Sequence, residues 1–300
     1  MKKDALYRQS FPLVFGIGFF FILVSCGGGS GGGKSRPSRN TPEFAYNEAK
    51  EALSAIKIEK AISLTNDVIT RFPNSEQAQR ARILRMVLLA GLAHGFEDLA
   101  NAHIEGFEKG GKNAGKLRST AFDYFRKQKN AVLGFNDTCE YFLQNYSDKA
   151  DYLLECDFPS KEASMNRLIE EVKKGNPLDE EQMKIAEEQE LRDGVLVSLA
   201  TFLGAESDRN KAKKLLEGGS KPLDPAELFV RIGRTYLEDQ HLFGRKGLSE
   251  IQYYRLFLQK AQECSNLAQK ILKDKPNKEI QAMADLLKAD LEAVEKKGRS

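Results

Sequence analysis

The sequence predicts an all-α protein built from antiparallel helical hairpins, arranged as a divergent α-solenoid or as a helical bundle. Three observations support this prediction. Apolar residues recur about every 3.6 residues, stretches that alternate with a period of two are scarce, and capping residues stand where helices should begin. In residues 60–72, for example, Ala61, Leu64 and Val68 fall on one helix face, and charged residues fill the opposite face.

The boundaries of the expected helices follow capping chemistry. Asn74 is the expected N-cap of one helix, with Gln77 three residues later to complete a capping box. Asp224, Pro225 and Glu227 place a cap, a first-turn proline and a capping-box acid before another helix. The predicted helices cover residues 43–58, 60–72, 75–94, 96–108, 116–146, 160–174, 179–203, 208–217, 225–240, 248–273 and 277–297.

Two segments are apolar on nearly every side, Met86–Ala93 and Val195–Ala205. Helices of that kind pack on more than one face, so we expect both in the centre of the protein. A change in composition across residues 147–159 is the expected internal boundary. It divides the body into a helical region at 42–146 and a second all-α region at 147–300 that packs against the first.

The first 25 residues have the pattern of an export signal. Lys2, Lys3 and Arg8 make a basic start, and the uncharged run Phe11–Ser25 follows. This run has 15 residues, fewer than the roughly 20 that a membrane-spanning helix needs, which disfavours an uncleaved anchor helix. Leu23-Val24-Ser25-Cys26 resembles the lipobox of bacterial lipoproteins. The resemblance implies cleavage before Cys26, acylation of that cysteine with palmitate among the chains, and attachment to a membrane.

Residues 26–41 are rich in glycine and offer little to bury, so we expect the lipidated cysteine to be followed by a flexible tether. Lipoproteins kept at the inner membrane often carry Asp after the cysteine, and here Gly27 stands in that place. The resemblance therefore favours the outer membrane, with the protein facing the periplasm of the cell envelope.

Residues 41–91 resemble a tetratricopeptide repeat followed by the first helix of another. Ala49, Ala61 and Val68 stand at its small-residue positions, and Pro73 ends the second helix. The phrase ITRFPNSEQAQRA is similar to the opening repeat of the helical lipoprotein in the outer-membrane barrel-assembly machinery. The resemblance implies stacked hairpins with a groove for a protein partner. Generic helical hairpins with small residues at the crossing are the alternative.

Composition bears on the class of partner. The net charge is +3, and removal of the leader reduces it to about +1, so no basic surplus remains for nucleic acid. Three cysteines remain in the body. Cys139 and Cys156 lie 17 residues apart and could form a disulfide, whereas burial of both and of Cys264 as small apolar side chains is the favoured interpretation. No Cys/His spacing is typical of a zinc site.

The chain offers few motifs for chemistry. Residues 110–117, GGKNAGKL, fit the phosphate-loop pattern, but Leu117 replaces the hydroxyl that binds magnesium and a charged helical segment precedes it. We therefore expect a solvated loop and no nucleotide. His94, His103 and His241 lack metal-ligand spacing and are predicted to be exposed or capping residues.

These observations predict a non-enzymatic scaffold that binds a partner protein of the envelope, with Cys26 the one assignable functional residue and no catalytic, cofactor or metal site. One alternative is an accessory component of a transport system that holds a small molecule or lipid in an apolar pocket between Met86–Ala93 and Val195–Ala205. A helical hydrolase is a third possibility, and it requires a cleft with a carboxylate of raised pKa.

Overall fold

The computed structural model describes residues 40–147, 150, 152–159, 167–206, 208–244 and 247–299. Cys26, the leader and nearly all of the tether lie outside the described residues. The chain from Pro37 to Ser300 forms one compact unit, and the all-α prediction is confirmed for its described part. None of the described helices combines the length and the apolar character that crossing a membrane requires.

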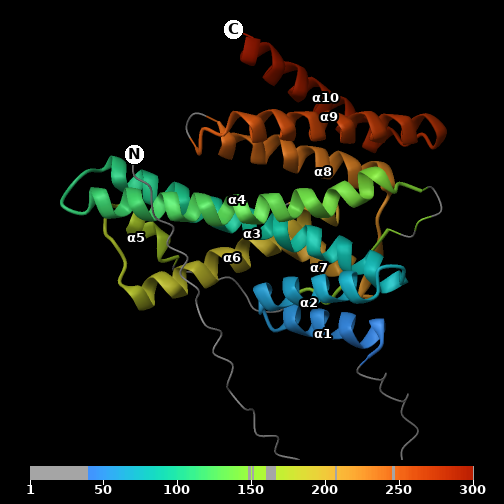
Figure 1. Ribbon diagram of the computed structural model, residues 1–300, viewed down its shortest axis with the longest axis horizontal. Coiled ribbons are helices and arrows are strands. Elements are labelled where there is room, and N and C mark those ends of the chain that lie inside the picture. Colours follow the sequence, from blue (N-terminus) through green and yellow to red (C-terminus); the bar gives the residue numbers. More distant parts are fainter. Residues whose placement is uncertain are drawn as a thin grey trace, which may run out of the picture. The chain divides into compact units, whose positions relative to one another are not determined.

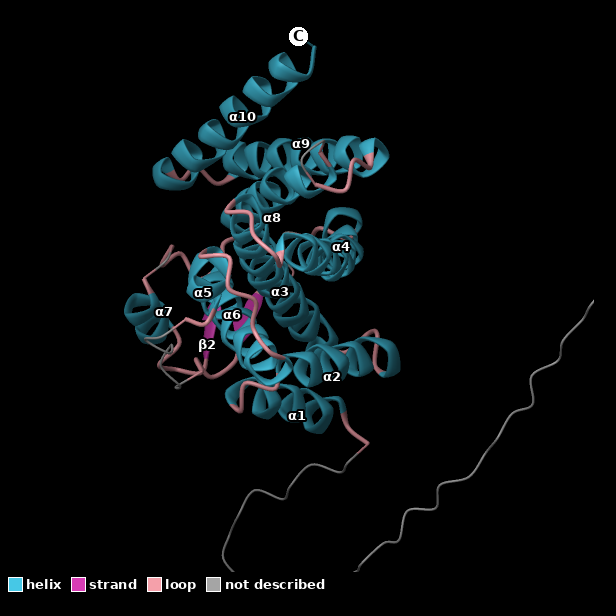
Figure 2. Cartoon of the chain, turned by 90° about the vertical axis from the view of Figure 1, so that its left-hand side faces the viewer, coloured by secondary structure: helices cyan, strands magenta, loops and turns pink. Residues whose placement is uncertain are grey.

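The helices follow one another in layers, from the α1–α2 hairpin through the α3–α4 hairpin to α8, α9 and α10 (Figures 1 and 2). The helices are α1 (Pro42–Ser54), α2 (Ile58–Arg71), α3 (Glu76–Glu108), α4 (Ala114–Gln144), α5 (Ile169–Lys173), α6 (Glu180–Phe202), α7 (Arg209–Leu215), α8 (Pro225–Asp239), α9 (Ile251–Asp274) and α10 (Lys278–Arg299), with a 3₁₀ turn η1 (Gln240–Phe243) after α8.

Helix α3 is the central element, and it packs against α1, α2, α4, α5 and α6. The sequence predicted two helices here with a break before residue 96, and that prediction is wrong, because α3 continues for 33 residues. Gly95 stands at the predicted break. A Cβ at Gly95 would lie 2.7 Å from the carbonyl oxygen of Glu190 and 2.8 Å from Cα of Leu191. The glycine therefore permits close approach of α6 and does not end the helix.

The two predicted central segments cross each other. Every residue of Met86–Ala93 is buried in α3, and most of Val195–Ala205 is buried in α6 and the turn after it. A Cβ at Gly91 would lie 2.5 Å from Cα of Val195, so the two backbones are in contact. The central position of both segments is confirmed. Neither of the two pockets described below is lined by a residue of these segments, so the expected apolar pocket between them stays a prediction.

Local capping sets most helix starts. Asp224 caps α8 as predicted, but the carboxylate of Glu227 pairs with Arg231 at 2.5 Å, so the expected capping box is not closed. The N-cap of α3 is Ser75, whose hydroxyl accepts a hydrogen bond from the first turn, and the prediction of Asn74 is wrong by one residue.

A two-stranded antiparallel sheet, which the sequence did not predict, joins β1 (Leu153–Glu155) to β2 (Ser220–Pro222). It ties the segment in which the composition changes to the segment just before α8. The hydroxyl of Tyr46 in α1 donates to the carbonyl oxygen of Glu155 at 2.8 Å, so the sheet is also fixed to the first hairpin. Of the helix predicted at 160–174, the structure describes only α5, because residues 160–166 are not described.

Candidate functional site

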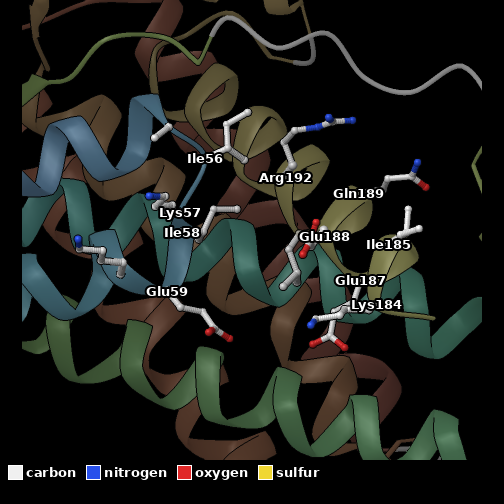
Figure 3. A pocket seen from close by; sticks show the side chains of 13 residues that line it. Ile56, Lys57, Ile58, Glu59, Lys184, Ile185, Glu187, Glu188, Gln189 and Arg192 are labelled. Carbon is white, nitrogen blue, oxygen red and sulfur yellow. The ribbon is translucent and has the colours of Figure 1, made fainter. Parts of the chain in front are cut away.

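An open groove of about 790 Å³ lies between the α1–α2 turn and the N-terminal half of α6 (Figure 3). Both sides come from rigid elements, because the turn joins two packed helices and α6 crosses α3 in close contact. The lining residues are Ala55, Ile56, Lys57, Ile58, Glu59, Lys60, Lys184, Ile185, Glu187, Glu188, Gln189, Leu191 and Arg192.

The turn that forms one side of the groove ends α1 with an unusual residue. The N–H of Lys57 donates to the carbonyl of Ala52 at 2.8 Å, and the N–H of Ile56 donates to that of Leu53 at 2.7 Å. This pair of bonds is the Schellman motif, whose left-handed position is normally occupied by glycine. Here Ile56 occupies it with φ of 58°. A β-branched side chain is strained in that conformation.

The apolar part of the lining comes from both sides of the groove. Ile56 and Ile58 stand on the turn, and Ile185 stands on α6 (Figure 3). Ile185 is 43% exposed, whereas Ile58 at the start of α2 and Leu191 in the middle of α6 are buried. The groove thus presents apolar side chains to solvent without enclosing them.

Charged side chains surround these isoleucines. Lys57, Lys60 and Lys184 have no ion pair within the described part of the chain, and neither has Glu59. Glu187 is already held, because Lys127 of α4 pairs with it at 2.6 Å and the hydroxyl of Tyr124 donates to it at 3.4 Å. The groove is therefore charged with both signs, and cations slightly exceed the acids left to face solvent.

Arg192 contributes a buried donor edge. Its side chain is 15% exposed, and its Nε and Nη2 atoms have no hydrogen-bond partner. Asp193 lies 3.6 Å from Nε, beyond hydrogen-bond length, and shares its carboxylate with Arg209 at 3.6 Å. The Nε and Nη2 edge of a guanidinium matches a carboxylate or a pair of carbonyl oxygens. Both atoms are closed to solvent, so a partner in the groove would reach this edge only by displacing the atoms that cover it.

A second pocket of about 360 Å³ lies beside the sheet, and Glu155, which lines it, is already paired with two cations. Glu155 accepts from Lys50 and, at 2.6 Å, from Arg80. Burial raises the pKa of Glu155, the hydrogen bonds from the two cations lower it, and the net result is a lowered pKa. Burial raises the pKa of the neighbouring Cys156 to about 12, so its thiol stays protonated and is a poor nucleophile.

Carboxylates of raised pKa lie elsewhere. Burial raises the pKa of Asp239, and the charges of Glu97 and Glu238 raise it further. Burial also raises the pKa of Glu97, and that of Glu190 despite its ion pair with Arg167. None of these groups lines either of the two pockets described above. Among the described residues, no cluster of His, Cys, Asp or Glu is arranged to hold a metal ion.

The structure shows where the cysteines and histidines named in the sequence analysis lie. Cys139, Cys156 and Cys264 are buried free thiols, which confirms the favoured interpretation over a disulfide. His241 is exposed, but His103 is buried, and its Nδ1 hydrogen-bonds the carbonyl of Leu99 at 2.7 Å, so the prediction of an exposed or capping residue is wrong there.

The phosphate-loop pattern forms the turn between α3 and α4 and the start of α4. Gly110 and Gly111 have positive φ, and no neighbouring atom lies within 4 Å of the position of their Cβ. A helix precedes them in place of a buried strand. The interpretation as a solvated interhelical loop is confirmed for residues 110–113, whereas residues 114–117 belong to α4 and Leu117 is buried.

The sequence resemblance implies a groove for a partner, but neither the position of this groove nor its lining was predicted. Its signal was the turn Ala55-Ile56-Lys57, which joins two helices without glycine. Tight helix ends usually need glycine, so an isoleucine there is a local anomaly. Comparison of the chain with protein-family models, with curated proteins and with solved structures finds no match.

Proposed function

We propose that the protein is a lipid-anchored scaffold of the bacterial cell envelope, which binds a segment of a partner protein in the groove between the α1–α2 turn and α6. The lipobox-like Leu23–Cys26 and the glycine-rich residues after it support the anchor. The open groove supports the scaffold, since paired helices with a groove between them commonly hold peptide segments.

Ile56 is the observation that carries the proposal. A left-handed non-glycine residue costs about 1 to 2 kcal/mol. Such strain is typically retained where the side chain is needed. Among the described residues, three that are not glycine have positive φ, and Ile56, the β-branched one of the three, lines the groove, so strain and candidate site coincide there.

The lining favours a peptide segment over a small apolar ligand. Small-molecule sites are mostly enclosed and apolar, with few polar groups. This groove is open and carries four cationic and three acidic side chains beside its isoleucines. An extended segment would place apolar side chains against Ile56 and Ile185 and an acidic group or backbone carbonyls near Arg192.

Site-specific photo-crosslinking tests the groove. A photoreactive residue in place of Ile185 in the full chain, expressed in its host, is expected to yield a discrete adduct with one envelope protein. The matched control is the same residue in place of Ile251, which is also exposed but lies on α9. The charge reversal Lys184→Glu should reduce the Ile185 adduct. Equal adducts from both positions, or none from either, would contradict the proposed docking site.

Metabolic labelling with a palmitate analogue tests the anchor separately. The wild-type chain is expected to carry the label and to sediment with membranes, and Cys26→Ser should lose both properties. Cys264→Ser is the control, because that thiol is buried in α9 and should leave labelling unchanged. An unlabelled wild-type chain would contradict the proposed lipid anchor without affecting the proposal for the groove.

A further inference from the structure

Helix α10 has two apolar stripes on nearly opposite faces. The first is buried against α8 and α9 and consists of Ile280, Ala284, Leu287 and Leu291. The second faces solvent and consists of Ala282, Leu286, Ala289 and Ala293, with Leu286 54% exposed. A surface helix normally needs only one such stripe, facing the core. We define the second set as the outer stripe.

The outer stripe has the spacing of a coiled-coil seam. Its residues follow one another at intervals of four, three and four, which is the alternation of a and d positions in a heptad. The seam continues with Glu279 at the start of α10 and Lys296 near its end, and both side chains are exposed. Outermost helices of stacked-hairpin proteins usually carry a polar outer face. Here α10 is the outermost layer (Figures 1 and 2), and its solvent-facing side carries the outer stripe between charged flanks.

We propose that the outer stripe binds the same stripe of a second copy of this chain, with the two α10 helices antiparallel. The charges at its ends favour this occupant and this direction. In the antiparallel pair, Glu279 of each copy lies opposite Lys296 of the other, so two oppositely charged pairs form. A parallel pair would place Glu279 against Glu279 and Lys296 against Lys296.

The antiparallel alignment also matches the apolar residues. When Glu279 faces Lys296, Ala282 faces Ala293 and Leu286 faces Ala289, so each Leu meets a small residue. Alanines at three of the four positions allow close approach of the two helices. On one flank, this alignment brings Asp285 near Glu292 of the other copy, and Lys288, at helical spacing from both acids, places a cation beside each of these contacts.

The contact is small. The seam from Glu279 to Lys296 extends for about 26 Å along the helix. One pair of helices of that length buries less than the roughly 1,600 Å² of a standard stable interface. We therefore expect a weak, reversible dimer, with a dissociation constant on the order of micromolar or above. It involves no residue of the groove, and so it stands or falls independently of the proposed function.

Capture of an untagged copy by a tagged copy tests the dimer, with the full chain in mild detergent. Wild-type copies should capture each other. Glu279→Lys alone makes both end contacts Lys–Lys, and Lys296→Glu alone makes both Glu–Glu. Each single variant should associate with itself about tenfold more weakly than the wild type. Lys270→Glu, a charge reversal at an exposed position of α9 away from the seam, should capture like the wild type.

The decisive measurement mixes the two single variants. Tagged Glu279→Lys with untagged Lys296→Glu forms two opposite-charge contacts in the antiparallel pair, so capture should return to the wild-type level. Loss of folding in either variant cannot produce that recovery. Three outcomes would overturn the proposal. The first is that wild-type copies do not capture each other. The second is equal capture by all variants, which two chains in one detergent micelle would give. The third is a mixed pair that associates no more strongly than the single variants.

Discussion

Ile56 occupies a backbone conformation that suits glycine, and the α1–α2 turn holds it there with two backbone hydrogen bonds. Its side chain is half-buried and packs against the core while it lines the groove. Strain and packing therefore act on the free energy of unfolding in opposite directions at this residue. Glycine at this position removes the whole side chain, whereas alanine keeps the Cβ atom. Comparison of the two variants therefore separates strain from packing.

We expect Ile56→Gly to be more stable than Ile56→Ala by about 1 kcal/mol, because only glycine relieves the left-handed strain. Both variants lose the same packing beyond Cβ. The order is the reverse of that in most structured positions, where glycine is the less stable of the two. Urea unfolding of both variants measures the difference. If alanine proves the more stable residue, Ile56 is not strained.

Asp239 is a second residue in an unfavourable environment, because its carboxylate is buried. It is 6% exposed, and its Oδ2 atom has no hydrogen-bond partner. Its pKa is raised above the usual value, so the folded state binds the proton more tightly than the unfolded chain does. The contribution of Asp239 to stability is therefore greatest below about pH 4 and declines as the pH rises toward its folded-state pKa.

Asp239→Asn should remove this dependence, since an amide of the same shape does not ionise. We expect the variant to be more stable than the wild type at pH 8, by on the order of 1 kcal/mol, and to lose that advantage as the pH falls toward 4. Denaturant unfolding across this range measures the effect. Asp67→Asn, on the exposed face of α2, is the control and should follow the wild type. A constant difference at every pH would show that Asp239 does not titrate as stated.

At the scale of elements, glycines set how closely α3 and α6 cross. The position of a Cβ at Gly194 lies 2.7 Å from the backbone nitrogen of Gly95 and against the carbonyl oxygen of Gly91. These neighbours are backbone atoms and cannot move aside as a flexible side chain can. The hydroxyl of Ser198 donates to the carbonyl of Val87 at 2.8 Å, which fixes the register of the same crossing.

Gly194→Ala should therefore lower the free energy of unfolding by about 2 to 4 kcal/mol, since the added methyl group forces the two helices apart. Helix propensity alone would favour alanine by up to about 1 kcal/mol. Gly115→Ala is the matched control, because nothing lies within 4 Å of its Cβ position in α4, and it should be neutral or slightly stabilising. Thermal unfolding of the two variants distinguishes packing from propensity.

The elements also show how far sequence reasoning reaches. Helix periodicity and residues such as Asp224 gave the fold class and most boundaries, because both signals are local. The break predicted before residue 96 falls at Gly95, and a glycine that ends a helix cannot be told from one that admits a neighbouring backbone unless that neighbour is known. The strands at Leu153 and Ser220 have three residues each, too few to show a period of two. The groove depends on how α6 lies beside the α1–α2 turn, which no local pattern records.

At the scale of the whole molecule, the chain from Pro37 onward shares one core. Buried side chains of α1 through α10 belong to a single cluster. The three thiols lie in different parts of this core: Cys139 in α4, Cys156 after β1 and Cys264 in α9. Each is at most 1% exposed. Burial also raises the pKa of all three thiols.

We expect all three thiols to be reduced in the native protein and to resist a thiol reagent until the chain unfolds. In the Cys26→Ser full chain they should then react together, at one rate that follows global unfolding. Mass spectrometry of the labelled protein measures the number of modified sites over time. Early modification of one cysteine alone would show that its region opens independently of the rest.

The length of α3 has a consequence for the order in which the protein can assemble. Ribosomes release the chain from its N-terminus, and α3 exists long before α6 does. Val87 accepts its hydrogen bond from a residue 111 positions later. Until α6 arrives, the apolar face of α3 that it covers has no partner, even though α1, α2 and α4 are already present. A nascent chain that stops after α4 should therefore aggregate or engage a chaperone, and this vulnerability ends only when α6 docks.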